Sequence, residues 1–533
     1  MLGGMQDWPL RIMRILDHAA REHGTRELVS LYADGTVTRT DWAGIQRDSR
    51  KLAAALERLG VRPGDRVATL AMNHSRHVVA WYGTIGMGGI IHTINPRLFD
   101  DQLAYIANHA EDRILFYDRA FAPLVERLKP RWTTIEKFIC FDPAPGEPGF
   151  ENLIDEEAGD YQWREGDERE PAMLCYTSGT TGDPKGVLYE HRSTVLQAMT
   201  LTSGDLFELT ARAVVLPVVP MFHAAAWGLP FATAIAGGKM VFSADYNPSV
   251  MCDLMRAEKV SHTAGVPTVW LALIAHVEAT DGDLASLRVV HIGGAAAPRS
   301  MIEWFRDRGI RVGHAWGMTE MSPLGTCGAP LGNWDELDDG AQLDYLCRQG
   351  RVPFGVELRT VDDAGAVLPR DGKASGRLQA RGPWVLRQYF QDERGPVIDA
   401  EGWFDTGDVA ILHADGVMQI TDRSKDVIKS GGEWISSIEL ENAAVGCPGV
   451  AEAAAVAVAH PKWDERPLLL VVRKPGAQIG AEEILAHLAD HVAKWWLPDE
   501  IVFVDSLPHT ATGKLLKTAL REQYRDYRLR TAA

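Results

Sequence analysis

The stretch YTSGTTGDPKGV, residues 176–187, decides how the rest of the chain is interpreted, because it concentrates small, hydroxyl and cationic residues. Its glycines let backbone N–H groups come close to a bound anion. The apolar run at 172–175 predicts the end of a buried strand, and open α/β sheets bind ligands at the carboxyl ends of their strands. We therefore predict a phosphate-binding loop, whose ligand-facing residues are Thr177, Ser178, Gly179, Thr180, Thr181, Gly182 and Lys185.

This loop does not match the Walker A pattern. GxxxxGK(S/T) requires a serine or threonine directly after the lysine, whereas Gly186 follows Lys185. The alternative interpretation is a solvated turn rich in glycine and threonine between a strand and a helix.

The loop resembles the signature of the adenylate-forming (AMP-binding) superfamily, which includes acyl-CoA synthetases, luciferases and the adenylation domains of peptide synthetases. The resemblance implies a two-step reaction that uses ATP, coenzyme A and Mg²⁺. A carboxylate attacks the α-phosphate of ATP, and a thiol then takes the acyl group from the acyl-adenylate. It also implies that Lys185 contacts the β- and γ-phosphates and that Thr180 and Glu320 lie at the metal.

A second stretch, HAWGMTEMSP at 314–323, is similar to the aromatic-Gly-Met-Thr-Glu motif of the same superfamily. The resemblance places the ring of Trp316 near adenine, Thr319 at the α-phosphate and Glu320 on Mg²⁺, with His314 and Gly317 in the nucleotide site. A single glutamate is chemically sufficient, because Mg²⁺ is held by a few carboxylate oxygens together with phosphate oxygens. Most relatives carry tyrosine where this chain has Trp316.

Three further segments are candidates for the acyl and adenine pocket. In PMFHAAAWGLP (220–230), the resemblance puts His223 beside the substrate carboxylate and Trp227 at the entrance of an acyl tunnel, although a core histidine and a packing tryptophan are the alternatives. In VSHTAGVPTVW (260–270), Gly265 and Trp270 are predicted to line the acyl pocket. In VVHIGGAAAP (289–298), small residues allow a flat base or an acyl chain close to the backbone, or simply close helix–strand packing; these residues are Gly293, Gly294, Ala295 and Ala296.

The remaining motifs lie toward the C-terminus. EGWFDTGD at 401–408 ends in Asp408, which the resemblance assigns to the ribose hydroxyls together with Arg423. Lys425 matches the position about which the C-terminal domain turns. Lys514, in PHTATGKLL at 508–516, matches the lysine that contacts the α-phosphate during adenylation, although Thr-Gly-Lys alone would be a solvated turn. Rotation at Lys425 would replace Lys514 with a face that lines the pantetheine path, formed by Lys429, Gly431, Gly432, Glu433 and Trp434.

Length predicts two or more domains, and periodicity predicts their class. A chain of 533 residues exceeds one ordinary core. Short apolar runs at 67–72 and 113–117 alternate with helical patterns at 101–110 and 190–201, which indicates α/β layering with mostly parallel strands. With the hinge that the resemblance places near Lys425, we expect a large multi-sheet N-terminal domain at 1–422 and a small, mobile α+β C-terminal domain at 423–533. In the latter, helices are predicted at 438–444 and 481–492 and strands at 450–458 and 467–472.

Composition restricts the partners and the compartment. A net charge of −17 without a basic block argues against nucleic acid. Six scattered cysteines without CxxC spacing favour a reducing cytoplasm, and no window reaches the roughly 18 apolar residues that span a bilayer. Analogy with related synthetases suggests a homodimer.

Together these motifs predict an AMP-forming acyl-CoA synthetase. TINPRLF, HAWGMTEMSPLG and HPKWDERPLL carry a narrower resemblance to fatty acyl-CoA synthetases and 3-methylmercaptopropionate-CoA ligases. We expect short or medium-chain fatty acids or 3-methylmercaptopropionate as substrates, with a long-chain or aryl-CoA ligase as alternatives within the family. The alternative from another class is a catalytically inactive nucleotide-binding scaffold or sensor.

Overall fold

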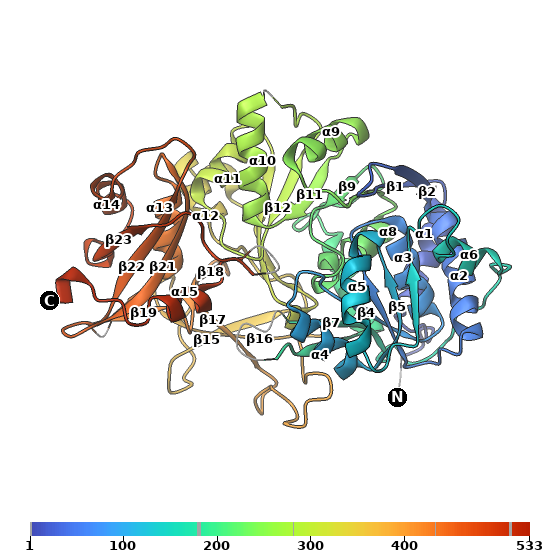
Figure 1. Cartoon of the computed structure of the whole chain (residues 1–533). Helices are drawn as coiled ribbons and strands as arrows, with labels where there is room; N and C mark the ends of the chain where they lie inside the picture. The colour runs from blue at the N-terminus through green and yellow to red at the C-terminus, as the bar shows by residue number, and fades with distance from the viewer. Residues whose placement is uncertain (1–2, 178–182, 281, 432, 511–513, 533) are drawn as a thin grey trace.

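The computed structural model describes residues 3–177, 183–280, 282–431, 433–510 and 514–532. A large N-terminal domain holds three β-sheets, and a smaller C-terminal domain holds a fourth (Figure 1). The predicted α/β class with a multi-sheet N-terminal domain and a small α+β C-terminal domain is therefore confirmed.

The first N-terminal sheet has six strands, and every neighbouring pair is parallel except the last, β7 with β8. Its central strands are apolar on both faces because helices cover both sides. In spatial order the strands are β6 (Lys137–Cys140), β5 (Asp112–Tyr117), β3 (Arg66–Leu70), β4 (Ile90–Thr93), β7 (Pro171–Tyr176) and β8 (Gly186–Glu190).

The second sheet has eight strands, and it joins distant parts of the sequence. Its two edge strands on one side come from the first 41 residues, whereas the others come from 214–327. In spatial order the strands are β14 (Leu324–Cys327), β13 (Arg311–Gly317), β12 (Val289–Ile292), β11 (His262–Gly265), β9 (Val214–Pro217), β10 (Lys239–Ser243), β1 (Glu27–Leu31) and β2 (Val37–Asp41).

Helices separate and cover these two sheets. The largest apolar core contains residues of both sheets and of the helices between them, which are α1 (Met13–His23), α2 (Trp42–Arg58), α3 (Ser75–Gly86), α7 (His191–Leu201) and α8 (Leu229–Ala236). A second core on the outer face of the eight-stranded sheet is covered by α9 (Pro248–Glu258), α10 (Pro267–Thr280), α11 (Arg299–Arg306) and α12 (Asp339–Leu346). The outer face of the six-stranded sheet is covered by α4 (Asp100–Ala110) and α5 (Ala122–Leu128), while α6 (Phe150–Asp155) contacts α2.

The third sheet is a four-stranded antiparallel meander that the sequence analysis did not anticipate. Its strands are β15 (Glu357–Val361), β16 (Ser375–Arg381), β17 (Phe404–Leu412) and β18 (Met418–Arg423). Buried and more open positions alternate along β16 and most of β15, but only partly along β17 and β18. The sequence analysis predicted a ligand role for Asp408 but no strand around it.

The C-terminal domain forms a mixed five-stranded sheet with helices on its faces. Its strands are β20 (Glu433–Ile435), β19 (Ile428–Ser430), β22 (Asp464–Arg473), β21 (Val450–His460) and β23 (Glu500–Phe503), and its helices are α13 (Ser437–Val445), α14 (Ala481–Ala489) and α15 (Lys517–Gln523). Each predicted strand and helix of this domain is present, but β22 begins three residues before the predicted start and α14 ends three residues before the predicted end.

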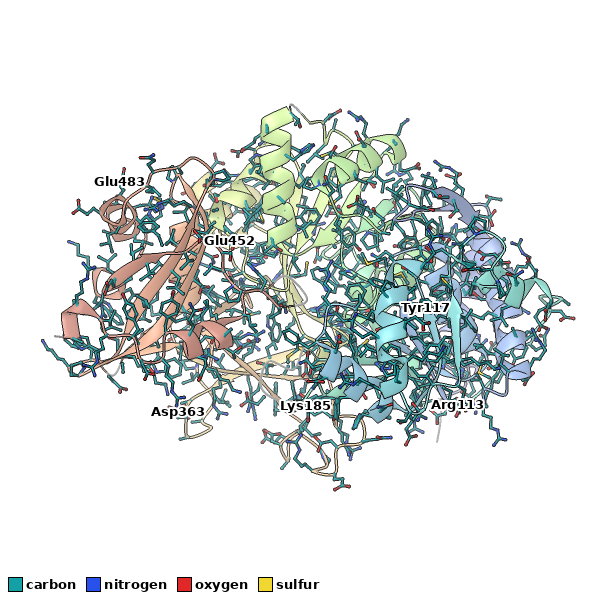
Figure 2. All side chains as sticks on the ribbon, in the orientation of Figure 1. Arg113, Tyr117, Lys185, Asp363, Glu452 and Glu483 are labelled. Atoms are coloured by element: carbon teal, nitrogen blue, oxygen red, sulfur yellow. The ribbon has the colours of Figure 1, made fainter. Side chains whose placement is uncertain are left out.

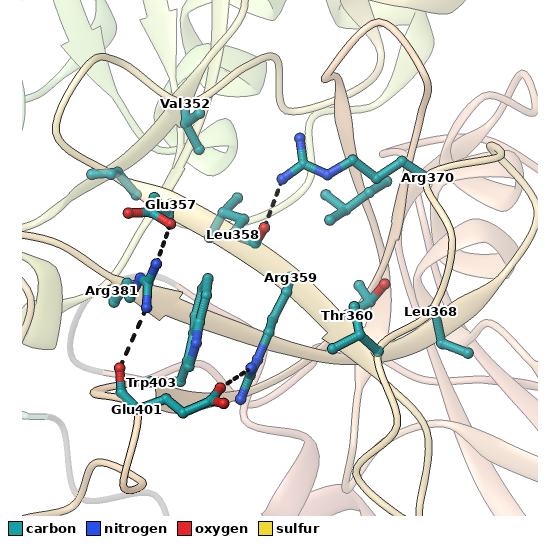
Figure 3. Close-up of a pocket in the computed structure, with 13 residues that line it drawn as sticks. Val352, Glu357, Leu358, Arg359, Thr360, Leu368, Arg370, Arg381, Glu401 and Trp403 are labelled. Carbon is teal, nitrogen blue, oxygen red and sulfur yellow. Dashed lines mark hydrogen bonds and ion pairs between the residues drawn. The ribbon is translucent and has the colours of Figure 1, made fainter.

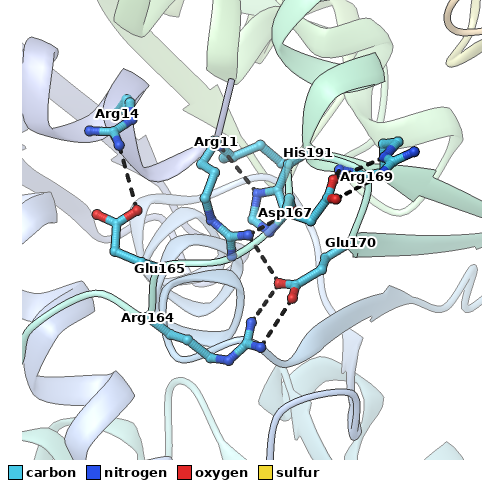
Figure 4. Close-up of polar contacts among 9 residues, drawn as sticks. Arg11, Arg14, Arg164, Glu165, Asp167, Arg169, Glu170 and His191 are labelled. Atoms are coloured by element: carbon cyan, nitrogen blue, oxygen red, sulfur yellow. Dashed lines mark hydrogen bonds and ion pairs between the residues drawn. The ribbon is translucent and has the colours of Figure 1, made fainter. Parts of the chain in front are cut away.

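A polar cluster fixes the N-terminal segment to the loop that leads into β7 (Figure 4). Arg11, only 2% exposed, donates to the Asp167 carbonyl oxygen at 2.9 Å and to Glu170 Oε2 at 3.0 Å. Arg164 also donates to Glu170 at 3.0 Å, and this hydrogen bond is the main reason that the pKa of Glu170 is lowered. The next backbone N–H after Arg11 donates to His191 Nδ1 at 3.2 Å. The acidic, poorly periodic segment before β7 thus binds the N-terminal segment of the chain.

Among the described residues, none of the helices is long and apolar enough to cross a membrane.

Candidate active site

One cavity between the two domains gathers most of the predicted site residues. Its volume is about 800 Å³. Lys185 and Glu452, which line it from the two domains, are labelled in Figure 2. The predicted residues in its wall are Thr177, Lys185, His223, Trp227, Gly293, Gly294, Ala295, Ala296, Trp316, Gly317, Thr319, Glu320, Asp408, Arg423, Lys425 and Lys514.

Strand ends supply much of this wall. Thr177 follows β7, Gly293 to Ala296 follow β12, and Trp316 and Gly317 end β13. Thr319 and Glu320 come next, in a short 3-10 helix. The carboxyl ends of neighbouring parallel strands meet at one edge of a sheet, which is where such sheets bind ligands.

The predicted phosphate loop connects two antiparallel strands. The expected strand before it is present as β7, but the loop is followed by β8 and not directly by a helix. Thr177 N–H donates to the Lys185 carbonyl at 2.9 Å, and Lys185 N–H donates to Thr177 Oγ1 at 3.1 Å, so the base of the loop is closed. The predicted ligands Ser178, Gly179, Thr180, Thr181 and Gly182 lie outside the described residues.

Tyr389 contacts both Lys185 and Glu320, the two charged residues predicted at the phosphate site, and the sequence analysis missed it. Its hydroxyl donates to Glu320 Oε1 at 2.8 Å, and Lys185 Nζ lies 4.8 Å from its ring centroid. Burial raises the pKa of Glu320, and the hydrogen bond from Tyr389 opposes that shift. Tyr189 fixes the same turn by donating to the Thr319 carbonyl at 2.7 Å. No signal in a single sequence distinguishes Tyr389 from an ordinary surface tyrosine.

Trp316 contacts the predicted ribose-binding carboxylate directly. Its indole Nε1 donates to Asp408 Oδ2 at 2.9 Å, and Arg423 Nε lies 3.6 Å from Asp408 Oδ1. Asp408 and Arg423 are register partners on β17 and β18. The antiparallel meander therefore sets these two opposite charges side by side at the cavity.

Lys514 reaches the cavity from the C-terminal domain. A β-carbon built on Gly294 would lie 3.5 Å from Lys514 Cε, so the two domains approach closely here. Lys514 N–H donates to Thr510 Oγ1 at 3.1 Å, which holds the turn that carries it. Burial lowers the pKa of Lys514 to about 8, with Arg423 contributing in the same direction. The ammonium group is thus charged near neutral pH but poised to lose its proton above it.

The segment that carries His223 and Trp227 has an uncommon backbone. Residues Ala224 to Trp227 all have φ between 39° and 55°, a left-handed run that is costly without glycine. Gln197 Nε2 donates to the Trp227 carbonyl at 3.2 Å. A β-carbon on Gly293 would lie 3.0 Å from Trp227 Cη2, so the indole is close against this part of the wall. Burial lowers the pKa of His223 to about 3, with nearby Lys514 contributing, and the imidazole is neutral at physiological pH.

Asn73 supports this segment and was also missed. It is fully buried, and its Nδ2 donates to the carbonyls of Pro217 at 3.0 Å and Val219 at 2.9 Å. Its Oδ1 accepts from Met221 N–H at 2.6 Å. All three contacts are to backbone just before His223, which makes Asn73 a positioning residue for that histidine.

Some predicted residues lie behind the cavity wall. Trp270 belongs to α10 and is fully buried in the core that this helix covers. Its ring fills the space beside Gly265, where a β-carbon would lie 2.8 Å from Trp270 Cζ2. In the described part of the chain the adjoining wall is formed by Val266 and Leu271, and neither Gly265 nor Trp270 belongs to it. His314 is also buried outside the wall. It accepts from Ala297 N–H and contacts the Cys347 carbonyl at 3.1 Å, so it supports the Gly-Ala turn from behind.

The predicted pantetheine face lies away from this cavity. Lys429 N–H donates to Glu465 at 2.7 Å, and Gly431 N–H donates to the Trp463 carbonyl at 2.7 Å. Lys429, Gly431 and Trp434 are absent from the described cavity wall. Glu433 begins β20, and Gly432 lies outside the described residues.

Glu320 is the described carboxylate that the resemblance assigns to Mg²⁺. Within the described ranges, no three His, Cys, Asp or Glu side chains converge to hold a metal ion. Glu320 is one buried carboxylate that faces the cavity beside Lys185. Such a site fits Mg²⁺ when phosphate oxygens and water complete its coordination, because this ion takes one or two carboxylates plus substrate phosphates.

A second hollow lies on the antiparallel sheet, away from these residues (Figure 3). Two of the three arginines that line it are neutralised by neighbouring acids: Arg359 pairs with Glu401 at 2.7 Å, and Arg381 pairs with Glu357 at 2.7 Å. Both guanidinium groups also lie 4.4 Å from the ring centroid of Trp403. The third arginine, Arg370, donates to the Leu358 carbonyl oxygen at 2.8 Å, so all three guanidinium groups bind other parts of the sheet surface.

Comparison with known proteins identifies the class. The model of the AMP-binding enzyme family matches residues 16–390, and that of the AMP-binding enzyme C-terminal domain matches 439–514. The chain therefore belongs to the AMP-binding enzyme family, and the resemblance stated from the motifs is confirmed.

Two named relatives and one solved structure match nearly the whole chain. The chain is 50% identical over 536 residues to a 3-methylmercaptopropionyl-CoA ligase of Ruegeria pomeroyi, covering 99% of each chain. It is 45% identical over 543 residues to a medium-chain-fatty-acid–CoA ligase of Ectopseudomonas oleovorans, covering 100% of this chain and 99% of the relative. Its fold matches the crystal structure of an anthranilate CoA ligase in complex with anthranoyl-AMP, with a TM-score of 0.87 at 24% identity, over 98% and 99% of the two chains.

Proposed function

We propose that this protein is an AMP-forming acyl-CoA synthetase that converts a carboxylate, ATP and CoA into acyl-CoA, AMP and pyrophosphate. The observation that carries the proposal is the convergence of Lys185, Glu320, Asp408 and Lys514 from two domains on one cavity. Relatives of nearly full-length coverage are named as CoA ligases.

In the first half-reaction the main obstacle is repulsion between a carboxylate and a polyphosphate. Lys185 and Lys514 supply positive charge on two sides of the cavity, so their role is alignment and charge neutralisation without a covalent enzyme intermediate. Neutral His223 has an N–H to offer the substrate carboxylate. Mg²⁺ held by Glu320 would neutralise phosphate charge when bound, and the predicted Thr180 contact belongs to the same proposal.

The second half-reaction requires space at the adenylate carbonyl for the thiol of CoA. In the arrangement described, Lys514 lies in the cavity wall, whereas Lys429, Gly431 and Trp434 of the predicted pantetheine face are not among the described residues of that wall. We propose that the C-terminal domain, residues 423–533, rotates about Lys425 relative to residues 1–422, withdrawing Lys514 and bringing that face to the pantetheine path. A short connecting segment can take up such a rotation at low cost.

For the acyl group we propose a short or medium-chain fatty acid or 3-methylmercaptopropionate. The aromatic and aliphatic side chains of Phe207, Trp227, Leu271 and Leu324 give the cavity an apolar part that suits an unbranched or thioether chain. Related chains named for these two substrate classes support the same range. Cytoplasmic location and a homodimeric assembly remain predictions.

The test is ATP- and CoA-dependent turnover on a panel of 3-methylmercaptopropionate, butyrate, octanoate, palmitate and cinnamate. Acyl-CoA is identified by mass spectrometry, and pyrophosphate is measured in the same reactions. A maximum at the short or medium acids is expected. A maximum at palmitate or cinnamate would overturn the acyl range, and ATP binding without turnover on any acid would favour an inactive nucleotide-binding protein.

A further inference from the structure

A buried polar network crosses the predicted hinge. Asp422 ends the predicted N-terminal domain, and Ser437 begins α13 of the C-terminal domain. Both are 0% exposed. Ser437 N–H donates to Asp422 Oδ2 at 2.7 Å, and Ser437 Oγ lies 2.8 and 3.0 Å from the two carboxylate oxygens. This carboxylate is therefore matched to donors that the other domain supplies.

The start of α13 is built to receive this carboxylate. Ser436 caps the helix by accepting from Glu439 N–H at 3.1 Å, and its hydroxyl donates to the Thr421 carbonyl across the same boundary. The N-terminus of a helix also favours a negative charge through its free N–H groups and its dipole. Asp422 and Thr421 thus hold the first turn of α13 by backbone and side-chain contacts together.

The same network continues to the segment that carries Lys514. Lys517 Nζ donates to Ser437 Oγ at 2.6 Å and pairs with Glu441 Oε1 at 2.7 Å. Lys517 is three residues after Lys514 and begins α15. Its side chain and that of Glu441 are about one-tenth exposed, so the pair is largely shielded from solvent. Contact at Asp422 is therefore linked through Ser437 and Lys517 to the position of Lys514.

We propose that Asp422 is a positioning residue that holds the C-terminal domain in the arrangement in which Lys514 occupies the active-site cavity. The inference rests on the proposed two-step function. Rotation about Lys425 leaves Asp422 with the N-terminal domain and moves Ser437 with the other, so the second half-reaction requires this contact to break. The strength of the contact therefore sets the balance between the two arrangements.

The test separates the two half-reactions in Asp422→Ala and in the milder Ser437→Ala, using full-length protein. Pyrophosphate release without CoA reports adenylation, and acyl-CoA formed from supplied acyl-adenylate reports thioesterification. Losing the hydrogen bonds between a carboxylate and its donors changes an equilibrium by about tenfold to a hundredfold. We expect adenylation to fall by about that factor in Asp422→Ala and less in Ser437→Ala, while thioesterification is unchanged or faster. The control is Asp415→Ala, an exposed aspartate at the β17–β18 turn, which is expected to alter neither half-reaction.

Equal loss of both half-reactions, or no change in either, would overturn the proposal, because a merely structural role cannot separate them. Hydrogen exchange on the unliganded proteins gives a second readout that needs no activity. Amides in the first turn of α13 and in the segment around Lys514 are expected to exchange at least about tenfold faster in Asp422→Ala than in the control. Faster exchange in the first turn alone would reduce Asp422 to a local cap. Wild-type protein inactive on every acid would refute the proposed function, while hydrogen exchange still decides the role of Asp422.

Discussion

Replacing Lys514 with alanine tests the division of the reaction between two arrangements of the domains. A β-carbon on Gly294 would lie 3.5 Å from Lys514 Cε, and Lys514 lines the same cavity wall as Glu320 and Asp408. Its ammonium group is therefore at hand for the phosphate chemistry proposed here, whereas thioesterification requires it to leave.

Burial makes the positive charge of that ammonium group costly. Its pKa falls from an ordinary value of 10.5 to about 8. Each pKa unit corresponds to about 1.4 kcal/mol, so the folded protein disfavours the charged form of Lys514 by about 3 kcal/mol. A buried cation of this kind stabilises a reaction most strongly when negative charge develops beside it. Removing one such preorganised group typically slows a reaction by about a hundredfold to a thousandfold.

The assay compares pyrophosphate release in the absence of CoA with acyl-CoA formation from supplied acyl-adenylate. Adenylation by Lys514→Ala is expected to fall by about a hundredfold or more, and thioesterification is expected to stay within about twofold of wild type because the withdrawn lysine does not touch that reaction. Lys474→Ala removes an exposed lysine of the same domain and serves as the control. An equal loss in both half-reactions would refute the reasoning.

Three further predictions concern single groups. Since Lys514 is charged below its pKa of about 8 and neutral above it, kcat/KM for adenylation should fall as the pH rises through about 8. Lys514→Arg keeps its charge at these pH values, so its kcat/KM should not fall in this pH range, even if the variant is slower. Trp316→Phe keeps an aromatic ring but removes the N–H that donates to Asp408, and a hydrogen bond to a charged group is worth about 1.5–3 kcal/mol. KM for ATP should therefore rise about tenfold or more, with little change in kcat. An unchanged KM would mean that the indole does not orient that carboxylate. Glu170→Gln leaves the buried guanidinium of Arg11 without its carboxylate, so denaturant titration should show a free energy of unfolding lower by about 2–4 kcal/mol. The control, Glu165→Gln at an exposed position, should change it by less than about 0.5 kcal/mol. Equal effects would contradict the stabilising role given to the Arg11–Glu170 cluster.

The family motifs led us to expect Lys185, Glu320, Asp408 and Lys514 at one site, and the structure brings all four into one cavity wall. Their individual roles stay predictions. Tyr389 and Asn73 carry no such pattern. Their roles arise from contacts with residues 69 and more than 140 positions away, respectively.

Predicted and observed roles differ most clearly for the aromatic residues. Trp227 and Trp270 lie in similar apolar stretches, yet one lines the cavity and the other fills the core behind it. Periodicity reports that a side chain is buried, but not whether it faces a ligand or another layer of protein. The direction of each indole depends on the backbone: a left-handed run turns Trp227 toward Gly293, while the start of α10 packs Trp270 against Gly265.

The sequence by itself determined the family, because short motifs carry the resemblance, and the α/β class, because period-2 and period-3.6 patterns are local properties of neighbouring residues. The phosphate-binding role of residues 176–187 and the domain boundary after residue 422 stay predictions. Only the tertiary structure decided that β1 and β2 join strands from 214–327, that an antiparallel meander pairs Asp408 with Arg423, and that Asp422 meets Ser437 and the segment of Lys514. Such pairings are chosen by the burial of whole faces and by hydrogen bonds across the fold, which no short window of sequence contains.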